Sequence, residues 1–272
     1  MKKIILFIIT YLLLGASISS AKEYLSKDPN YINRGSLWGH TGVSNYKKNE
    51  RHKHNYRIVI DPTGTSPFKK VEKFSPRKGD CGNEMSRQAN RSDCESGRLR
   101  LEIHNSRDKI TKKKKPFETW FGYYIFVPED FPIDKHFAPY ITQFYGETKR
   151  QRGGHAPQIS ASIVNSKLVH FGKTIVDEKN LKGKWNKIEF QIKWSIQKDG
   201  FVKVYHNGEL KSSTENYKTM SHDKVQIKYG TYNHKGNSTI YPEGYQFPGH
   251  TIYFAGVSIS KTRDKLKVNK IK

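Results

Sequence analysis

The chain has 272 residues, with 49 Lys and Arg against 25 Asp and Glu, and a formal net charge of +24 at pH 7. Such a surplus predicts a polyanionic partner, because clustered cations raise the local concentration of anions. Nucleic acid, acidic polysaccharide and anionic membrane are the candidates. The length fits one large all-β domain or two small ones, and no apolar run is long enough for a transmembrane helix.

Residues 1–21 have the layout of a secretory signal peptide. Lys2 and Lys3 precede an apolar run from Ile4 to Leu14, and small residues lead to Ala21, after which cleavage is expected. The mature protein is therefore expected to be secreted or periplasmic, without membrane contact. Export favours acidic polysaccharide as the partner. Nucleic acid is not expected, because no known module with interleaved aromatic and basic residues is present.

Cys81 and Cys94 are the two cysteines of the sequence. In an exported chain an even pair predicts one disulfide that closes a short loop. Closing a loop of this size stabilises the fold by roughly 3 kcal/mol in the chain-entropy description. Half of a metal site is the alternative, but no Cys-x-x-Cys pair or matched histidine spacing supports it. We therefore expect a disulfide and no metal.

The remaining chain is predicted to form one domain of short strands. Residues 22–55 are polar with little periodicity and predict an irregular segment before a domain at 56–262, and 263–272 read as a basic tail. Residues 66–97 are predicted to form a long basic loop. Period-two alternation and aromatic or β-branched runs predict strands at 56–60, 97–104, 119–127, 140–145, 158–164, 185–194, 201–206, 226–234 and 251–260. This pattern of strands and turns is typical of a β-sandwich.

The strand at 226–234 separates its side chains into two sets. Lys228, Gly230, Tyr232 and His234 share one face, while the alternate residues share the other. A cation, a glycine that lets a ligand approach, a phenol and an imidazole suit an acidic substrate. The alternative is an exposed polar strand face without a ligand.

Two other strands carry candidate site residues. In the strand at 97–104 the apolar side chains predict a core face, which leaves Arg98, Arg100, Glu102 and His104 together on the other surface. The strand at 140–145 places Gln143 and Tyr145 on one face. For the strand at 97–104 the alternative is a solvated face with cross-strand ion pairs, and for Gln143 it is an ordinary amide at a strand end.

Four segments carry a family resemblance. They are Arg100-Leu101-Glu102, Trp120 to Phe131, Gly183 to Gly208, and Lys228 to Tyr232. In this order they resemble the polysaccharide lyase superfamily that includes heparin lyase I and the glucuronan lyases, with more distant similarity to alginate lyases. Together they span roughly residues 97–260. The third segment is the most specific, but it indicates mainly the fold, because concanavalin-like sandwiches of other functions share it.

The resemblance implies an all-β, concanavalin-like β-jelly-roll sandwich of two antiparallel sheets, with a concave groove for an anionic polysaccharide. It also implies cleavage of a uronate-containing polysaccharide by β-elimination. No cofactor is expected to be required, structural calcium is an option, and a monomer is expected. In this chemistry Arg, Lys or an amide neutralises the uronate carboxylate. A base then removes the C5 proton, and an acid protonates the departing O4.

The resemblance also assigns roles. Tyr232 matches the catalytic tyrosine of a Gly-x-Tyr motif, and Lys228 matches the lysine four residues earlier. Arg100 matches the arginine of an Arg-x-Glu motif, in which Glu102 is expected to orient it. Gln143 matches a glutamine beside the substrate carboxylate. The tyrosine can serve as acid or base if nearby cations lower its pKa.

The expected histidine of the family's Gln-x-His motif is absent, because the chain reads Gln143-Phe144-Tyr145. His155, on the glycine-containing loop that follows, is the favoured base, and Tyr145 is the alternative. The other groups on these faces are expected to bind substrate: Lys228, Tyr145, Glu102, His104 and His234.

Two other functions compete with a lyase. A non-catalytic carbohydrate-binding protein could use the same groove, and the missing histidine favours this alternative. A glycoside hydrolase is disfavoured, because no strand carries paired carboxylates at the Glu-x-Asp spacing that hydrolysis requires.

Overall fold

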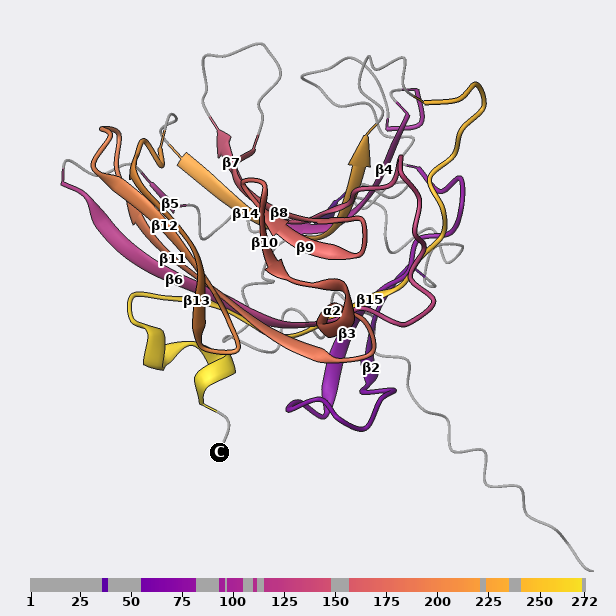
Figure 1. The fold of residues 1–272 in the computed structure, drawn as a ribbon, viewed down its shortest axis with the longest axis horizontal. Coiled ribbons are helices and arrows are strands. Elements are labelled where there is room, and N and C mark those ends of the chain that lie inside the picture. The colour runs from indigo at the N-terminus through magenta and orange to yellow at the C-terminus, as the bar shows by residue number, and fades with distance from the viewer. Residues whose placement is uncertain are drawn as a thin grey trace, which may run out of the picture.

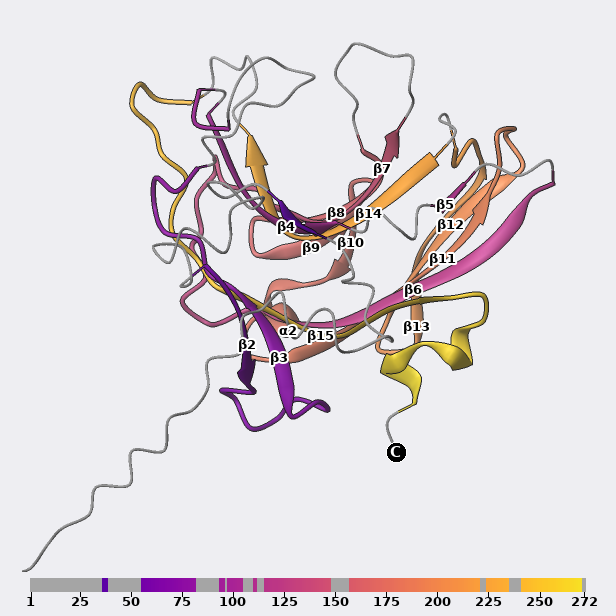
Figure 2. The same ribbon diagram turned by 180° about the vertical axis from the view of Figure 1, so that it is seen from behind.

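The computed structural model describes residues 36–38, 55–81, 93–95, 97–104, 110–111, 115–147, 157–220, 224–234 and 241–270. In these residues two antiparallel sheets stack face to face, as Figures 1 and 2 show from opposite sides. The predicted two-sheet β-sandwich is therefore confirmed. We call the two layers the site sheet and the back sheet.

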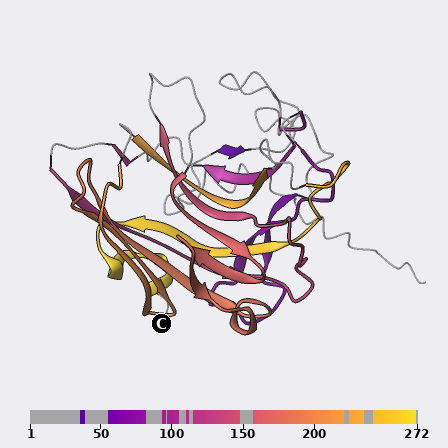
Figure 3. The same cartoon turned by 45° about the horizontal axis from the view of Figure 1, so that its top comes forward.

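The site sheet contains, in spatial order, β1 (Ser36–Trp38), β4 (Arg98–His104), β14 (Lys224–His234), β7 (Tyr140–Glu147), β8 (Pro157–Val164), β9 (Lys167–His170) and β10 (Lys173–Val176), with β5 (Ile110–Thr111) paired to β14. The back sheet contains, in spatial order, β13 (Glu209–Tyr217), β12 (Gly200–His206), β11 (Trp185–Trp194), β6 (Phe117–Phe126), β15 (Ile252–Ser260), β3 (Lys70–Phe74) and β2 (Tyr56–Ile60). Figure 3 shows the site sheet lying across the back sheet.

Some strands lie where the sequence indicated none. Strand β1 falls in the segment expected to be irregular, and β3 falls in the expected loop at 66–97. Strand β13 is polar and forms one edge of the back sheet. A polar edge strand lacks the apolar alternation that identifies half-buried strands.

Helical structure is scarce in the described residues. It consists of α2 (Glu178–Leu181) and two 3-10 helices, η3 (Arg263–Lys265) and η4 (Lys267–Asn269). No helix in this part of the chain is long and apolar enough to cross a membrane.

Aromatic rings from both sheets form the core. Phe121 of β6 meets Phe144 of β7 edge to face, with ring centres 5.5 Å apart. Tyr229 of β14 meets Phe254 of β15 in the same way at 5.4 Å. Such pairs each add about 0.5–1.5 kcal/mol beyond the burial of their area. Because these contacts fix one face of β7 and β14, the side chains on the opposite face start from well-defined backbone positions.

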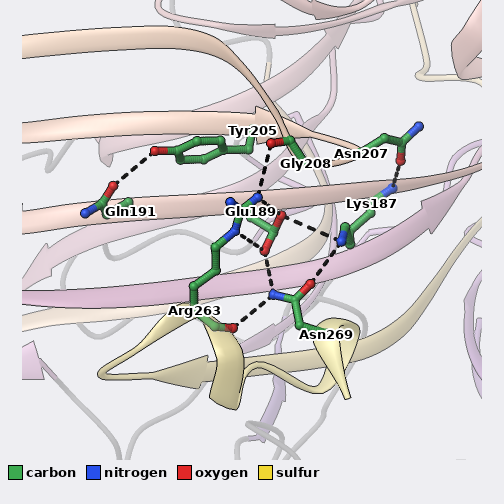
Figure 4. Close-up of polar contacts among 8 residues, drawn as sticks. All are labelled: Lys187, Glu189, Gln191, Tyr205, Asn207, Gly208, Arg263 and Asn269. Atoms are coloured by element: carbon green, nitrogen blue, oxygen red, sulfur yellow. Dashed lines mark hydrogen bonds and ion pairs between the residues drawn. The ribbon is translucent and has the colours of Figure 1, made fainter. Parts of the chain in front are cut away.

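The C-terminal 3-10 helices lie against the outer face of the back sheet (Figure 4). Glu189 of β11 accepts hydrogen bonds from Arg263 Nε at 3.0 Å, Arg263 Nη2 at 2.7 Å and Asn269 Nδ2 at 2.7 Å. Burial acts to raise the pKa of Glu189, but these hydrogen bonds outweigh it and hold the pKa below its usual value. The charged carboxylate therefore anchors the end of the chain far from the site sheet.

The predicted disulfide is confirmed. Cys81 and Cys94 are bonded, with their Cα atoms 5.0 Å apart. The bond joins the turn after β3 to the turn before β4, so it links the back sheet to the site sheet.

Candidate active site

The candidate site is the outer face of the site sheet, which curves so that this face is concave (Figure 1). Leu99, Leu101 and Ile103 of β4 are buried in the core. Because side chains alternate along a strand, Arg100 and Glu102 point to the opposite, outer face.

Strand pairing brings the predicted residues of three strands together. Strand β14 lies between β4 and β7. Tyr232 is opposite Arg100 on one side and Tyr140 on the other. Lys228 is opposite Gln143 of β7. Groups far apart in sequence are thus neighbours on one surface.

Arg100 lies between a carboxylate and an aromatic ring. Its Nη2 donates a hydrogen bond to Asp93 Oδ1 at 2.9 Å, and its Cζ lies 4.8 Å from the centre of the Tyr232 ring. Arg98 Nη1 is 3.9 Å from the same Asp93 oxygen. Arg100 is 8% exposed and Asp93 is also 8% exposed, so this ion pair is largely removed from water.

A second cluster of polar residues surrounds Lys228 of β14. Gln143 Nε2 donates to Glu102 Oε1 at 2.5 Å, and Lys228 Nζ lies 4.2 Å from the centre of the Tyr145 ring. Glu102, Gln143 and Lys228 are all buried. Glu102 was expected to orient Arg100, whereas the hydrogen bonds found here join Glu102 to Gln143 and Arg100 to Asp93.

Burial is the largest influence on the pKa values of the Glu102 and Asp93 carboxylates. Burial raises the pKa of Glu102, and the positive charges of Lys228 and Arg100 offset part of this effect. Burial likewise raises the pKa of Asp93 despite the opposing charges of Arg100 and Arg98. The face therefore holds cations and carboxylates that have both lost much of their hydration.

Tyr232 lies at the centre of an aromatic row. Its ring stacks on Tyr140 with centres 6.0 Å apart and on His234 with centres 5.6 Å apart. Burial raises the pKa of Tyr232 to about 12, and the charges of Arg100 and Arg98 oppose this only in part. Burial therefore outweighs the expected lowering of the Tyr232 pKa by nearby cations. At neutral pH the phenol keeps its proton, which suits a proton donor.

His234 is the exposed end of this row. Partial desolvation lowers the pKa of His234, and the charges of Arg98 and Arg100 lower it further. The imidazole is therefore uncharged at neutral pH.

Gly230 has a role that differs from the one expected. Its φ is +134°, a conformation that L side chains rarely adopt. A Cβ at this position would lie 2.3 Å from the Leu101 carbonyl oxygen and 2.9 Å from a ring carbon of Phe74. The pairing of β14 with β7 also shifts register between Tyr229 and Tyr232. The glycine therefore permits an irregularity next to Tyr232, instead of leaving space for a ligand.

Two predicted residues are not placed in detail. His155 lies outside the described residues, and for His104 the structure gives the strand position, opposite Lys228, without its side chain. Among the residues that the structure does describe, no group of three or more His, Cys, Asp or Glu could hold a metal ion.

The sequence interpretation missed Asp93 and Tyr140. Asp93 lies in a short turn without periodicity, and its position beside Cys94 was the one available signal. Tyr140 begins a predicted strand, and its approach to Tyr232 depends on the register shift between β7 and β14.

Comparison with known protein families shows which family the chain belongs to. Residues 33–258 match the family described as polysaccharide lyase. The chain belongs to this polysaccharide lyase family. The predicted resemblance to lyases is thus confirmed, and the family match runs from before β1 into β15.

Solved structures support the fold of this polysaccharide lyase. An endo-β-1,4-glucuronan lyase from the fungus Trichoderma reesei is 16% identical with a TM-score of 0.55, and the match covers 85% of this chain and 98% of that chain. A variant of the family 7 alginate lyase A1-II′, crystallised with product, is 15% identical with a TM-score of 0.53, and the match covers 86% and 97%. At these identities the similarity shows the shared jelly-roll fold. A search of curated proteins found no match.

Proposed function

We propose that this polysaccharide lyase is exported and cleaves a uronate-containing polysaccharide by β-elimination. The observation that carries the proposal is the buried set of Arg100, Lys228 and Gln143 on the same face as a protonated Tyr232. The two similar structures, a glucuronan lyase and an alginate lyase, support a uronate substrate. The signal-peptide pattern of residues 1–21 supports export.

Binding of the substrate carboxylate is assigned to Arg100, Lys228 and the Gln143 amide. Charges in a site with little water interact more strongly than in solution. Preorganised cations and amide donors therefore stabilise the negative charge that builds up on the carboxylate when C5 loses its proton. Glu102 accepts from Gln143 and so fixes which way the amide points.

Proton transfer is assigned to Tyr232 and one base. The base takes the C5 proton, the electron pair forms the C4–C5 double bond, the C4–O4 bond breaks, and O4 takes the Tyr232 proton. Tyr232 suits the acid step because its pKa is raised to about 12. His155 is the proposed base, with Tyr145 as the alternative.

Ultraviolet absorbance tests the proposal, because elimination creates an unsaturated uronate at each new chain end. The purified protein is incubated with glucuronan, heparin-type chains and alginate. We expect absorbance to rise with at least one of them. Salt-sensitive binding to these polymers without any rise in absorbance would contradict the proposal and indicate the non-catalytic alternative.

A further inference from the structure

We propose that Asp93 is a positioning residue of the active site, holding the Arg100 guanidinium against the Tyr232 ring, and that the Cys81–Cys94 disulfide holds Asp93 in place. This inference rests on the proposed function only in so far as its kinetic test needs turnover. The structural part of the proposal is that Asp93, which belongs to none of the motifs above, sets the geometry of Arg100 and Tyr232.

A tight turn delivers Asp93 to the site. The Arg98 backbone N–H donates to the Asp93 carbonyl oxygen at 2.8 Å, and the Gly97 N–H donates to the Cys94 carbonyl oxygen at 3.2 Å. Gly97 has a φ of +60°, which allows the chain to reverse here. The turn ends at the first residue of β4, so the Asp93 carboxylate reaches the side chains that leave β4 on the outer face.

Arg100 is held from two sides. Asp93 Oδ1 accepts from Nη2 at 2.9 Å, and the Tyr232 ring lies 4.8 Å from Cζ. An arginine side chain has many rotamers, and a charge-assisted hydrogen bond to one nitrogen of its guanidinium group favours a few of these rotamers. Asp93 therefore decides where the guanidinium stands relative to the phenol that donates the proton.

The disulfide connects the turn that carries Asp93 to the anchored turn that follows β3. Cys94 is the neighbour of Asp93, and its partner Cys81 follows a turn in which Asp80 accepts from the Arg77 N–H at 2.7 Å. The same turn is attached to the loop before β15, because the His250 N–H donates to the Pro76 carbonyl oxygen at 3.1 Å. Because this turn is held in place, the disulfide also restrains the position of Asp93.

Asp93 also affects the pKa of Tyr232 electrostatically. Its negative charge raises the pKa of the phenol, whereas Arg100 and Arg98 lower it. The charged and titratable groups around the phenol are Arg98, Arg100 and Glu102 of β4, Asp93 of the preceding turn, His234 of β14 and Tyr140 of β7. Replacing Asp93 by Asn removes one charge while leaving an oxygen that accepts from Arg100. The pKa of Tyr232 should therefore fall.

The kinetic test compares Asp93→Asn, Asp93→Ala and Arg100→Ala on the uronan that the wild type cleaves. We expect kcat to fall about 10-fold in Asp93→Asn and about 100-fold in Asp93→Ala, with KM changing less, because misplacement of a group by about 1 Å can cost 100-fold. In the Arg100→Ala background, Asp93→Ala should have no further effect on kcat. Asp264→Asn is the matched control, because it makes the same charge change at an exposed residue of η3.

The disulfide is tested by a Cys81→Ser, Cys94→Ser double variant. It should reproduce most of the kcat loss of Asp93→Ala, and combining it with Asp93→Ala should give less than the sum of the two effects. Thermal unfolding confirms that each variant is folded at the assay temperature. If a variant does not fold, mild reduction of the folded wild type replaces it and should lower kcat in the same way.

Tyrosine ionisation provides a readout that needs no turnover. The ultraviolet titration difference between Asp93→Asn and Asp93→Asn/Tyr232→Phe reports the Tyr232 pKa, which should lie below the wild-type value. Unchanged kcat in folded Asp93→Ala, additive losses with Arg100→Ala, or an unchanged Tyr232 titration would each overturn the inference. If the wild type cleaves no uronan, the proposed function fails, while the titration still decides whether Asp93 acts on Tyr232.

Discussion

At the residue scale, the balance of burial and charge around Tyr232 decides its chemistry. Two guanidinium groups act to ionise the phenol, but burial acts against ionisation more strongly, and the pKa rises to about 12. In the proposed elimination, a phenol that keeps its proton at neutral pH can give that proton to O4. The same raised pKa makes Tyr232 a poor base, so the proposal assigns removal of the C5 proton to a second residue.

Tyr232→Phe removes the transferred proton and keeps the ring. We expect kcat on the preferred uronan to fall at least about 100-fold, because general acid catalysis contributes about 100- to 10,000-fold. Binding of the polymer should change little, since the ring still stacks on Tyr140 and His234. Tyr253→Phe, on the back sheet, is the control and should retain wild-type kcat. Equal losses of kcat and affinity in Tyr232→Phe would contradict the assigned role.

Gly230→Ala should destabilise the protein strongly. The new Cβ would meet backbone at 2.3 Å and the Phe74 ring at 2.9 Å, in a strained conformation. Backbone strain and overpacking each cost about 1–3 kcal/mol. Denaturant unfolding should therefore show a loss of about 2–5 kcal/mol. Gly172→Ala is the control, because it has a φ of +74° but open space around it, and it should lose only the cost of strain.

At the element scale, the buried His250 holds the loop at 241–250 against the core side of β14. The Pro248 carbonyl oxygen must accept from His250 Nδ1–H at 3.1 Å, so Nε2 accepts from the Thr231 hydroxyl at 2.7 Å. Thr231 is the neighbour of Tyr232. The neutral imidazole therefore supports the strand from behind the site.

Stability should fall as His250 is protonated. Burial lowers the pKa of His250 from 6.5 to about 4. The folded state thus disfavours the proton, so the stabilisation is fully present above pH 6.5 and is lost as the pH falls toward 4. The difference corresponds to about 3 kcal/mol. Comparing the free energy of unfolding of the wild type and His250→Gln across this range isolates the effect, because other titrating groups are common to both. An identical pH slope in the two proteins would refute it.

The sequence predicted the strands that matter for the site, because they alternate apolar and polar residues. Alternation in β4 predicted Arg100 on the polar face of that strand, and alternation in β14 predicted Lys228 and Tyr232 on one face. The pairing of the two strands then brings these faces together. Asp93 was not predictable in this way, since its contact with Arg100 depends on a disulfide-bonded turn. The conformation of Gly230 depends on register with β7, which one strand's pattern does not specify.

At the scale of the whole molecule, the back sheet and the site sheet differ in what their outer faces carry. The back sheet contributes aromatic packing and anchors the C-terminal helices through Glu189 (Figure 4). The site sheet packs against the core with one face and carries the candidate site residues on its outer face. The sequence carries a formal net charge of +24 at pH 7, and a surplus of this sign is expected to raise the local concentration of a polyanion near the protein.

Salt should therefore weaken capture of the polymer more than it changes the chemical step. Raising the ionic strength from about 0.05 M to about 0.5 M shortens the screening length several-fold. We expect KM for a polyuronate to rise markedly while kcat changes little, because the buried groups around Tyr232 are screened less. Steady-state kinetics across a salt series measure both. A KM that is independent of salt would show that the surface charge plays no part in capture.

The central claim is elimination at a uronate, and the mass of the products tests it most directly. The wild-type protein is incubated with a purified uronan oligosaccharide of known mass, and the two fragments are measured by mass spectrometry. Elimination predicts fragments whose masses add up to that of the parent, with the unsaturated ring on the fragment that carries the new non-reducing end. Fragments that together exceed the parent by one water would show hydrolysis and contradict the proposed elimination.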